Sequence, residues 1–171
     1  EEPNEKKPKL EDLGYGPGVP LPPDPRPNFG GSNSEADDLF WEVKLASARD
    51  IAGYTENKHL DKISEILNSS SELINIKATS FSVPIINEAV CSGSLTVTQK
   101  LLEYNPDLLM TNGFGETSLK RGISLIKQGK GNSYIPCCIE ILKAHCKAGT
   151  IDTSVFSEPI QESENWNSYF C

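Results

Sequence analysis

The sequence lacks long hydrophobic runs, and it is short of positive charge. No apolar run approaches the roughly 20 residues that span a bilayer, and no signal-peptide pattern is visible. Acidic residues outnumber basic ones by 24 to 16, and residues 150–171 hold four acidic side chains and no basic one. The lack of a long apolar run argues against a membrane-embedded protein. The excess of acidic residues argues against binding to nucleic acid, which requires a basic surface.

Histidine is scarce, and both copies are poorly placed for chemistry. His59 falls at an expected helix start, and His145 is adjacent to Cys146 on a helix, so those two side chains point in different directions. Gly113-Phe114-Gly115 lacks the flanking strand and helix that make a phosphate-binding loop. We therefore expect no catalysis. A cysteine-dependent enzyme that uses Cys91 or Cys146 remains an alternative.

The five cysteines are odd in number, and three of them fall at apolar positions of expected helices. This pattern is typical of small buried side chains in a reducing compartment, which places the protein in the cytoplasm or nucleus. Cys137, Cys138, His145 and Cys146 lie along one helix instead of forming the paired ligands of a zinc site. We expect neither a metal nor a cofactor.

Proline and glycine are concentrated at the start of the chain. Residues 1–33 hold 8 of the 12 prolines and 5 of the 13 glycines, a composition that predicts a disordered arm. Val19–Pro27 favours an extended polyproline II conformation. The segment is expected to be a disordered linker, and the alternative is a ligand for an SH3-like groove with Arg26 as its charged end. A third interpretation is that Leu10–Phe29 packs back on the folded part. The first residue is Glu1 instead of Met, so we expect a processed product or a fragment.

Helical periodicity covers residues 34–149 and predicts three pairs of helices. Ser34 followed by Asp37 resembles a capping box and opens a helix that runs to about Ala52. Asn57 is expected to cap the second helix. The other expected helices are Pro84–Ser92, Ser94–Tyr104, Thr117–Gln128 and Ile135–Ala148.

Apolar spacing also predicts which face of each helix is buried. In the last helix we expect Cys138, Ile139, Leu142 and Cys146 to point inward. The segments 72–83 and 107–116, which separate the pairs, are expected to form protruding loops like β-hairpins. A loop at 127–133 is expected to join the two helices of the last pair, because it contains two glycines and an asparagine.

The segment from Pro84 to Ile123 resembles one unit of an ankyrin-repeat protein. The resemblance rests on four short motifs: Gly93-Ser94-Leu95, Leu101-Leu102, Gly115 and Thr117-Ser118-Leu119. It implies an all-α solenoid of about three degenerate units, at about 34–83, 84–116 and 117–149. Asn87 and Lys120 replace the histidine of the family, and Ser80 or Ser82 stands in place of one of its glycines.

The resemblance implies a binding module, with a partner protein on the concave face and the loop tips. Phe81 and Phe114 occupy loop-tip positions 33 residues apart, where exposed aromatic side chains make good hot spots. The alternative is that each ring folds onto its own loop. The resemblance places the partner-binding residues at Phe81, Val83, Cys91, Thr111, Phe114, Glu116 and Leu125.

Two further expectations concern the context of the domain. We expect a monomer outside its complex, and the composition is similar to ankyrin proteins that intracellular bacteria or viruses deliver into host cells. The alternative is a regulatory or assembly domain of a larger protein. Residues 150–171 combine acidic and aromatic side chains, including Trp166 and Phe170, and either cap the last unit or act as a docking peptide.

Overall fold

Helices dominate the computed structural model, which describes residues 34–54, 57–78 and 82–156. These residues all belong to the second of the two units into which the chain divides, Gly31–Cys171. The expected arm at 1–33, including Val19–Pro27, lies outside the described residues. The six α-helices in the described part are α1 (Glu35–Ile51), α2 (Lys58–Ser69), α3 (Ile85–Ser92), α4 (Leu95–Leu102), α5 (Ser118–Lys127) and α6 (Tyr134–Ala148).

Short elements fill some of the links between the helices. A 3-10 helix, η2 (Ser71–Asn75), follows α2, and a second one, η3 (Thr153–Phe156), follows α6. The strands β1 (Lys77–Ala78) and β2 (Val83–Pro84) pair antiparallel, with Lys77 opposite Pro84. The hairpin confirms the expected shape of the first loop, whereas η2 was not predicted. In 107–116 turns replace the expected hairpin.

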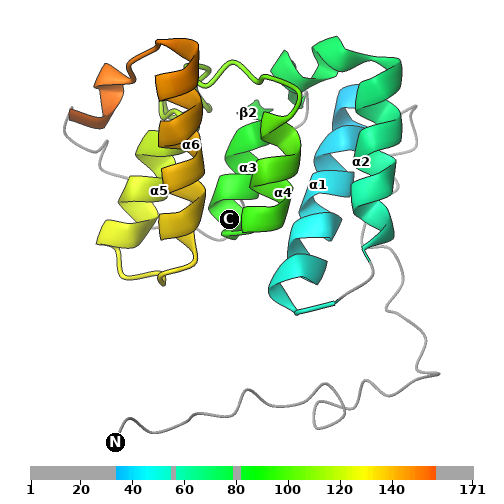
Figure 1. Ribbon diagram of the computed structural model, residues 1–171, viewed down its shortest axis with the longest axis horizontal. Helices are drawn as coiled ribbons and strands as arrows, with labels where there is room; N and C mark the ends of the chain where they lie inside the picture. The colour runs from blue at the N-terminus through cyan, green and yellow to red at the C-terminus, as the bar shows by residue number, and fades with distance from the viewer. Residues whose placement is uncertain (1–33, 55–56, 79–81, 157–171) are drawn as a thin grey trace, which may run out of the picture. The chain divides into compact units, whose positions relative to one another are not determined.

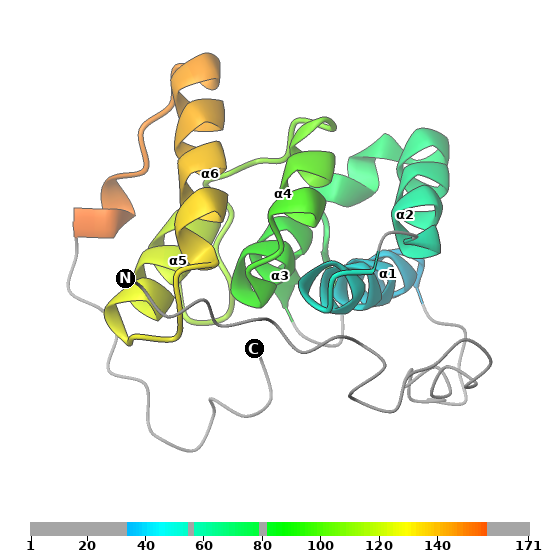
Figure 2. The same ribbon diagram turned by 60° about the horizontal axis from the view of Figure 1, so that its bottom comes forward.

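The helices are arranged as three pairs that stand side by side in sequence order, α1–α2, α3–α4 and α5–α6 (Figure 1). α3 packs between α1 and α5, and α4 packs against α6. Figure 2 shows α1, α3 and α5 in one layer and α2, α4 and α6 in the other. The described part of the chain is therefore a two-layered, mostly helical structure, as the periodicity predicts.

Hydroxyl side chains cap three of the helices, and the cap at Ser34 was predicted. Ser34 Oγ accepts from the backbone N–H of Asp37 at 3.2 Å, and Ser94 and Thr117 cap α4 and α5 in the same way. Each cap satisfies a backbone donor that has no partner within the helix, a contribution of about 1 kcal/mol. The sequence therefore predicts these three helix starts to within one residue.

Two other predicted helix starts are wrong in detail. Asn57 stands at the N-cap position of α2, but its side chain does not cap the helix. Its Nδ2 instead donates to the backbone oxygen of Ala46 at 2.8 Å and ties α2 to α1. Pro84 belongs to β2 and precedes α3 instead of lying in its first turn. A tertiary contact and a strand pairing thus decide these two residues.

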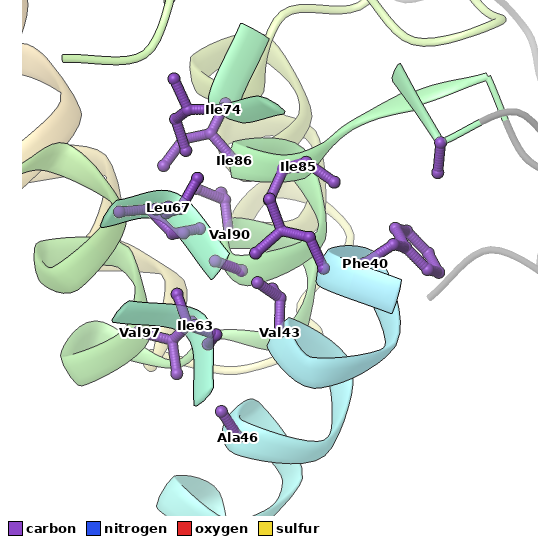
Figure 3. Close-up of a cluster of buried hydrophobic side chains, with 14 of the residues drawn as sticks. Phe40, Val43, Ala46, Ile63, Leu67, Ile74, Ile85, Ile86, Val90 and Val97 are labelled. Atoms are coloured by element: carbon purple, nitrogen blue, oxygen red, sulfur yellow. The ribbon is translucent and has the colours of Figure 1, made fainter. Parts of the chain in front are cut away.

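Figure 3 shows the part of the buried core in which the first two helical pairs meet. The labelled side chains are aliphatic or aromatic and are at most 3% exposed, and burying each one that is larger than alanine stabilises the fold by about 1.5–3 kcal/mol. Neither pair would bury its apolar face without the other. The labelled members are Phe40, Val43, Ala46, Ile63, Leu67, Ile74, Ile85, Ile86, Val90 and Val97.

The predicted buried face of α6 is wrong except for Cys138. Ile139 and Leu142 are 45% and 48% exposed, and Cys146 is exposed as well. The side chains that α6 buries are Cys137, Cys138, Ile141 and His145. Apolar side chains line two faces of this helix at helical spacing, so periodicity alone selects the wrong one.

Close contact between α5 and α6 selects the buried face. A Cβ atom added to Gly122 in α5 would lie 2.5 Å from Cys138 Sγ and 3.0 Å from Val90 Cγ1. Only glycine permits this approach, because real Cβ atoms do not come that close to other atoms. The missing side chain at residue 122 thus brings the Cys138 face of α6 against α5 and α3.

Candidate partner-binding face

The loop tip between the second and third helical pairs is a tight turn built around Asn112. Asn112 Oδ1 accepts from the backbone N–H groups of Phe114 and Glu116, at 2.9 and 3.0 Å. The backbone N–H of Asn112 donates to the carbonyl of Glu116 at 2.9 Å, and Gly115 adopts a φ of 74°. The turn holds the ring of Phe114 half-buried at the tip.

Side chains anchor this turn to the helices on both sides of it. Asn87 in α3 donates from Nδ2 to the backbone oxygen of Glu116 at 3.2 Å. Arg121 Nη1 in α5 lies 3.5 Å from Glu116 Oε2, and both side chains are buried. Burying one of these charges alone would be costly, so each requires the other. Glu116 therefore connects the loop tip to both α3 and α5.

Ser82 shapes the first loop. Its φ is 50°, in the left-handed region that favours glycine, and its N–H donates to Ala78 O at 2.8 Å. Ser82 therefore takes the backbone conformation of the glycine that the ankyrin resemblance would place here. The loop-tip residue Phe81 lies outside the described residues.

Acidic side chains in the α1 and α3 layer have basic partners. Glu42 Oε2 in α1 lies 2.7 Å from His59 Nδ1 in α2, and both side chains are largely buried. Glu88 in α3 lies 3.7 Å from Lys44 Nζ in α1. Burial raises the pKa of Glu88, and Lys44 opposes this shift only in part. These pairs tie α1 to α2 and to α3.

Lys44 also joins the charged pair to an aromatic surface on α1. Its ammonium lies 5.7 Å from the ring centres of both Phe40 and Trp41. The side chain of Lys44 is 39% exposed and Trp41 is half-buried. Cation–π attraction and the carboxylate of Glu88 thus hold one partly accessible cation beside an indole ring.

The predicted partner-binding residues that the structure describes fall into two groups, one half-buried and one buried. Val83, Thr111 and Phe114 are half-buried, so part of each side chain lies at the surface. Cys91, Glu116 and Leu125 are only 7%, 3% and 2% exposed. These three contribute to packing or to the support of the loop. The structure brings Thr111, Phe114 and Glu116 together in one segment.

The structure places His59 and four of the cysteines in the described part of the chain. His59 pairs with a carboxylate, and no group of three or more metal-ligating side chains forms within residues 34–54, 57–78 and 82–156. Burial raises the pKa of Cys137 and raises that of Cys138 to about 11. Both thiols are therefore protonated at neutral pH, and a protonated thiol is a poor nucleophile.

A second surface feature lies between the C-terminal end of α4 and the C-terminal half of α6. An open groove of about 440 Å³ has an apolar floor that includes Leu102, Pro106, Leu108 and Ala144. Lys143 and Lys147 of α6 form part of its rim. Sequence analysis did not identify this groove, because its two sides are separated by more than 30 residues.

Sequence reasoning also missed Asn112 and Arg121, which organise the loop tip. The dipeptide Asn112-Gly113 is a turn signal that identifies the first of them. Arg121 gives no such signal, because only the fold brings it to Glu116.

Comparison with protein-family models, with curated proteins and with solved structures finds no match to this chain. No helix in the described ranges has the length and apolar character needed to cross a membrane.

Proposed function

We propose that the chain is a non-catalytic protein-binding module, an ankyrin-like array of about three degenerate units, with its binding site centred on Phe114. The observation that carries the proposal is the turn at 112–116. Backbone and side-chain hydrogen bonds of Asn112 organise it, and the bond from Asn87 to Glu116 fixes it to α3, yet the turn holds an aromatic ring partly at the surface. A preorganised, half-exposed aromatic residue is a favourable hot spot, because little entropy is lost when a partner covers it.

We infer that other partly exposed side chains belong to the same site. Val83 and Thr111 are half-buried, as Phe114 is, and Lys44 with Trp41 offers a cation beside an aromatic ring. In an ankyrin array the layer of α1, α3 and α5 together with the loop tips forms the concave side. The four cysteines in the described part are free thiols, which fits a reducing compartment.

The proposal is tested with the full chain and a matched pair of variants. Phe114→Ala removes the ring at the tip, whereas Leu109→Ala removes an equally apolar side chain, 46% exposed, from the same inter-pair segment. Both variants are checked by circular dichroism for an unchanged fold. Proteins that the wild-type chain captures from a cell lysate are identified, and the affinity of each is then measured with purified components.

We expect Phe114→Ala to raise the Kd of a genuine partner at least about tenfold, the effect of losing one hot-spot side chain. Leu109→Ala should change it less than about threefold. Equal loss with both variants would contradict the loop-tip site. The absence of any protein that binds the purified wild-type chain would contradict the binding-module function.

A further inference from the structure

One face of α6 is apolar and exposed, at the end of the row of helices. Ile135, Ile139 and Leu142 are 40%, 45% and 48% exposed, and Cys146 is exposed too. Their spacing of four, three and four residues places them in one line along the helix. We call these four residues the α6 stripe. Four aligned apolar side chains on the surface form a continuous strip, the kind of surface that another segment or a partner can cover.

The α6 stripe lies on the side of the helix away from α4. The buried residues Cys138 and Ile141 face the other helices, and Ala144 and Lys147 line the groove beside α4. Helix geometry, at 100° per residue, puts the stripe on the opposite flank from that groove. A further helical pair would pack there if the row continued. In arrays of repeats this end must be covered, because each unit buries only the faces that its neighbours meet.

The chain leaves the described structure on the same flank. Asp152, after α6, is buried and accepts hydrogen bonds from the hydroxyl of Thr117, which caps α5, and from the N–H of Ser154. These contacts hold η3 against α5, on the outer side of the last pair (Figure 2). Phe156, the last described residue, is 84% exposed.

The segment that follows has the composition and the length to cover the stripe. Residues 157–171 contain Ile160, Trp166, Tyr169 and Phe170. Fifteen residues reach up to about 50 Å, whereas the stripe from Ile135 to Cys146 is about 16 Å long. The segment therefore reaches every position of the stripe from its anchor at η3.

Charge complementarity favours the same contact. Residues 157–171 carry three glutamates, Glu158, Glu162 and Glu164, and no basic side chain. Residues 127–149, which include α6, carry four lysines and a single acidic residue, Glu140. Lys143 and Lys147 lie on the groove side of α6, so the complementarity is between the two segments as a whole and adds no charge to the stripe itself. The attraction between the two segments is intramolecular, which raises their effective concentration.

We propose that residues 157–171 dock on the α6 stripe of the same molecule, with Trp166 and Phe170 as apolar anchors, and close the free end of the helical row. This contact is independent of the partner-binding site at Phe114. Of the two interpretations of the C-terminal segment, the proposal selects the intramolecular cap over the docking peptide.

Cys146 is a built-in reporter for this contact, because it belongs to the stripe. In the full-length chain, the rate of Cys146 alkylation at neutral pH is followed by peptide mass spectrometry. We expect Trp166→Ser combined with Phe170→Ser to raise that rate about tenfold, since protection tracks the closed fraction. The control variant, Asn165→Ser with Asn167→Ser, changes two polar residues of the same segment and should leave the rate unchanged.

A reciprocal experiment changes the stripe and leaves the sequence of residues 157–171 unaltered. Ile139→Ser alters the stripe alone, and it should accelerate limited proteolysis within residues 157–171 about tenfold, with an unchanged circular dichroism spectrum. Equal alkylation rates in the wild-type and Trp166→Ser, Phe170→Ser chains would overturn the proposal. Protection of Cys146 that increases with protein concentration would overturn it as well, because a second copy would then be the cover.

Discussion

Asn87 and Glu116, 29 residues apart, are joined by a hydrogen bond from the Asn87 side chain to the backbone oxygen of residue 116. The bond connects the first turn of α3 to the base of the next loop tip. Both residues are buried, at 1% and 3% exposed. The position of the half-exposed Phe114 thus depends on the packing of a helix from the preceding pair. The proposed binding site is therefore as rigid as the core that supports it.

The turn at the proposed site should lose stability when its central amide is removed. Asn112→Ala deletes the acceptor of two backbone N–H groups, those of Phe114 and Glu116. We expect the free energy of unfolding to fall by about 1–2 kcal/mol, measured by urea denaturation. Asn132→Ala, in an exposed loop, is the matched control and should cost less than about 0.5 kcal/mol. Equal effects would show that Asn112 does not organise the loop.

The link between η3 and α5 should depend on Thr117. This residue caps α5 and donates its hydroxyl proton to Asp152. Thr117→Val keeps the shape of the side chain but removes both the cap of α5 and the hydrogen bond to Asp152. The buried carboxylate of Asp152 then has one donor fewer. We expect a loss of about 1–3 kcal/mol in urea denaturation. Thr153→Val, at an exposed position next to Ser154, is the control, and a loss as large as that of Thr117→Val would contradict the capping role.

The close approach of α5 and α6 should make Gly122 intolerant of a methyl group. Alanine favours a helix by about 1 kcal/mol over glycine. Its Cβ, however, would lie 2.5 Å from Cys138 Sγ and 3.0 Å from Val90 Cγ1. We expect Gly122→Ala to destabilise the protein by about 1–3 kcal/mol, the usual cost of overpacking.

A double-mutant cycle identifies the clashing atom. Cys138→Ala removes the thiol that Gly122→Ala would meet, so the double variant should be more stable than the sum of the two single effects predicts. We expect a coupling energy of at least about 0.5 kcal/mol, measured from urea midpoints. Additive effects would show that the contact with Cys138 does not set the distance between the helices.

The pH dependence of stability should report the buried carboxyl of Glu88. Burial raises its pKa in the folded state above the ordinary value of 4.5. The folded state therefore holds the proton more tightly than the unfolded state. The stability associated with this proton is present below pH 4.5 and is lost as the pH rises through the raised pKa.

Glu88→Gln removes this titration. We expect the difference in unfolding free energy between variant and wild type to shift in favour of the variant from pH 4.5 to pH 7. Urea denaturation at both pH values measures the shift. Glu65→Gln, on the exposed side of α2, is the control and should show a smaller shift. A shift in the opposite direction would mean that the attraction of Lys44 outweighs the cost of burial.

Local chemistry explains the features that the sequence predicted correctly. Ser34, Ser94 and Thr117 cap helices because a hydroxyl next to free backbone N–H groups needs no tertiary contact. The three helical pairs follow from apolar spacing in the same way, since that spacing is a property of each segment alone. The shape of the β1–β2 hairpin was also predicted, although no glycine occupies the position of Ser82.

Contacts between distant segments decided the rest. Apolar spacing is enough to predict that α6 is a helix, but Ile139 and Leu142 satisfy the helical pattern as well as Cys137 and Ile141 do. Packing against α5, where Gly122 leaves space for Cys138, selects the face that is buried and the face that is left exposed. The same holds for the loop tip. Asn112-Gly113 predicts a turn, but the support from Asn87 and Arg121 exists only because packing brings α3 and α5 together.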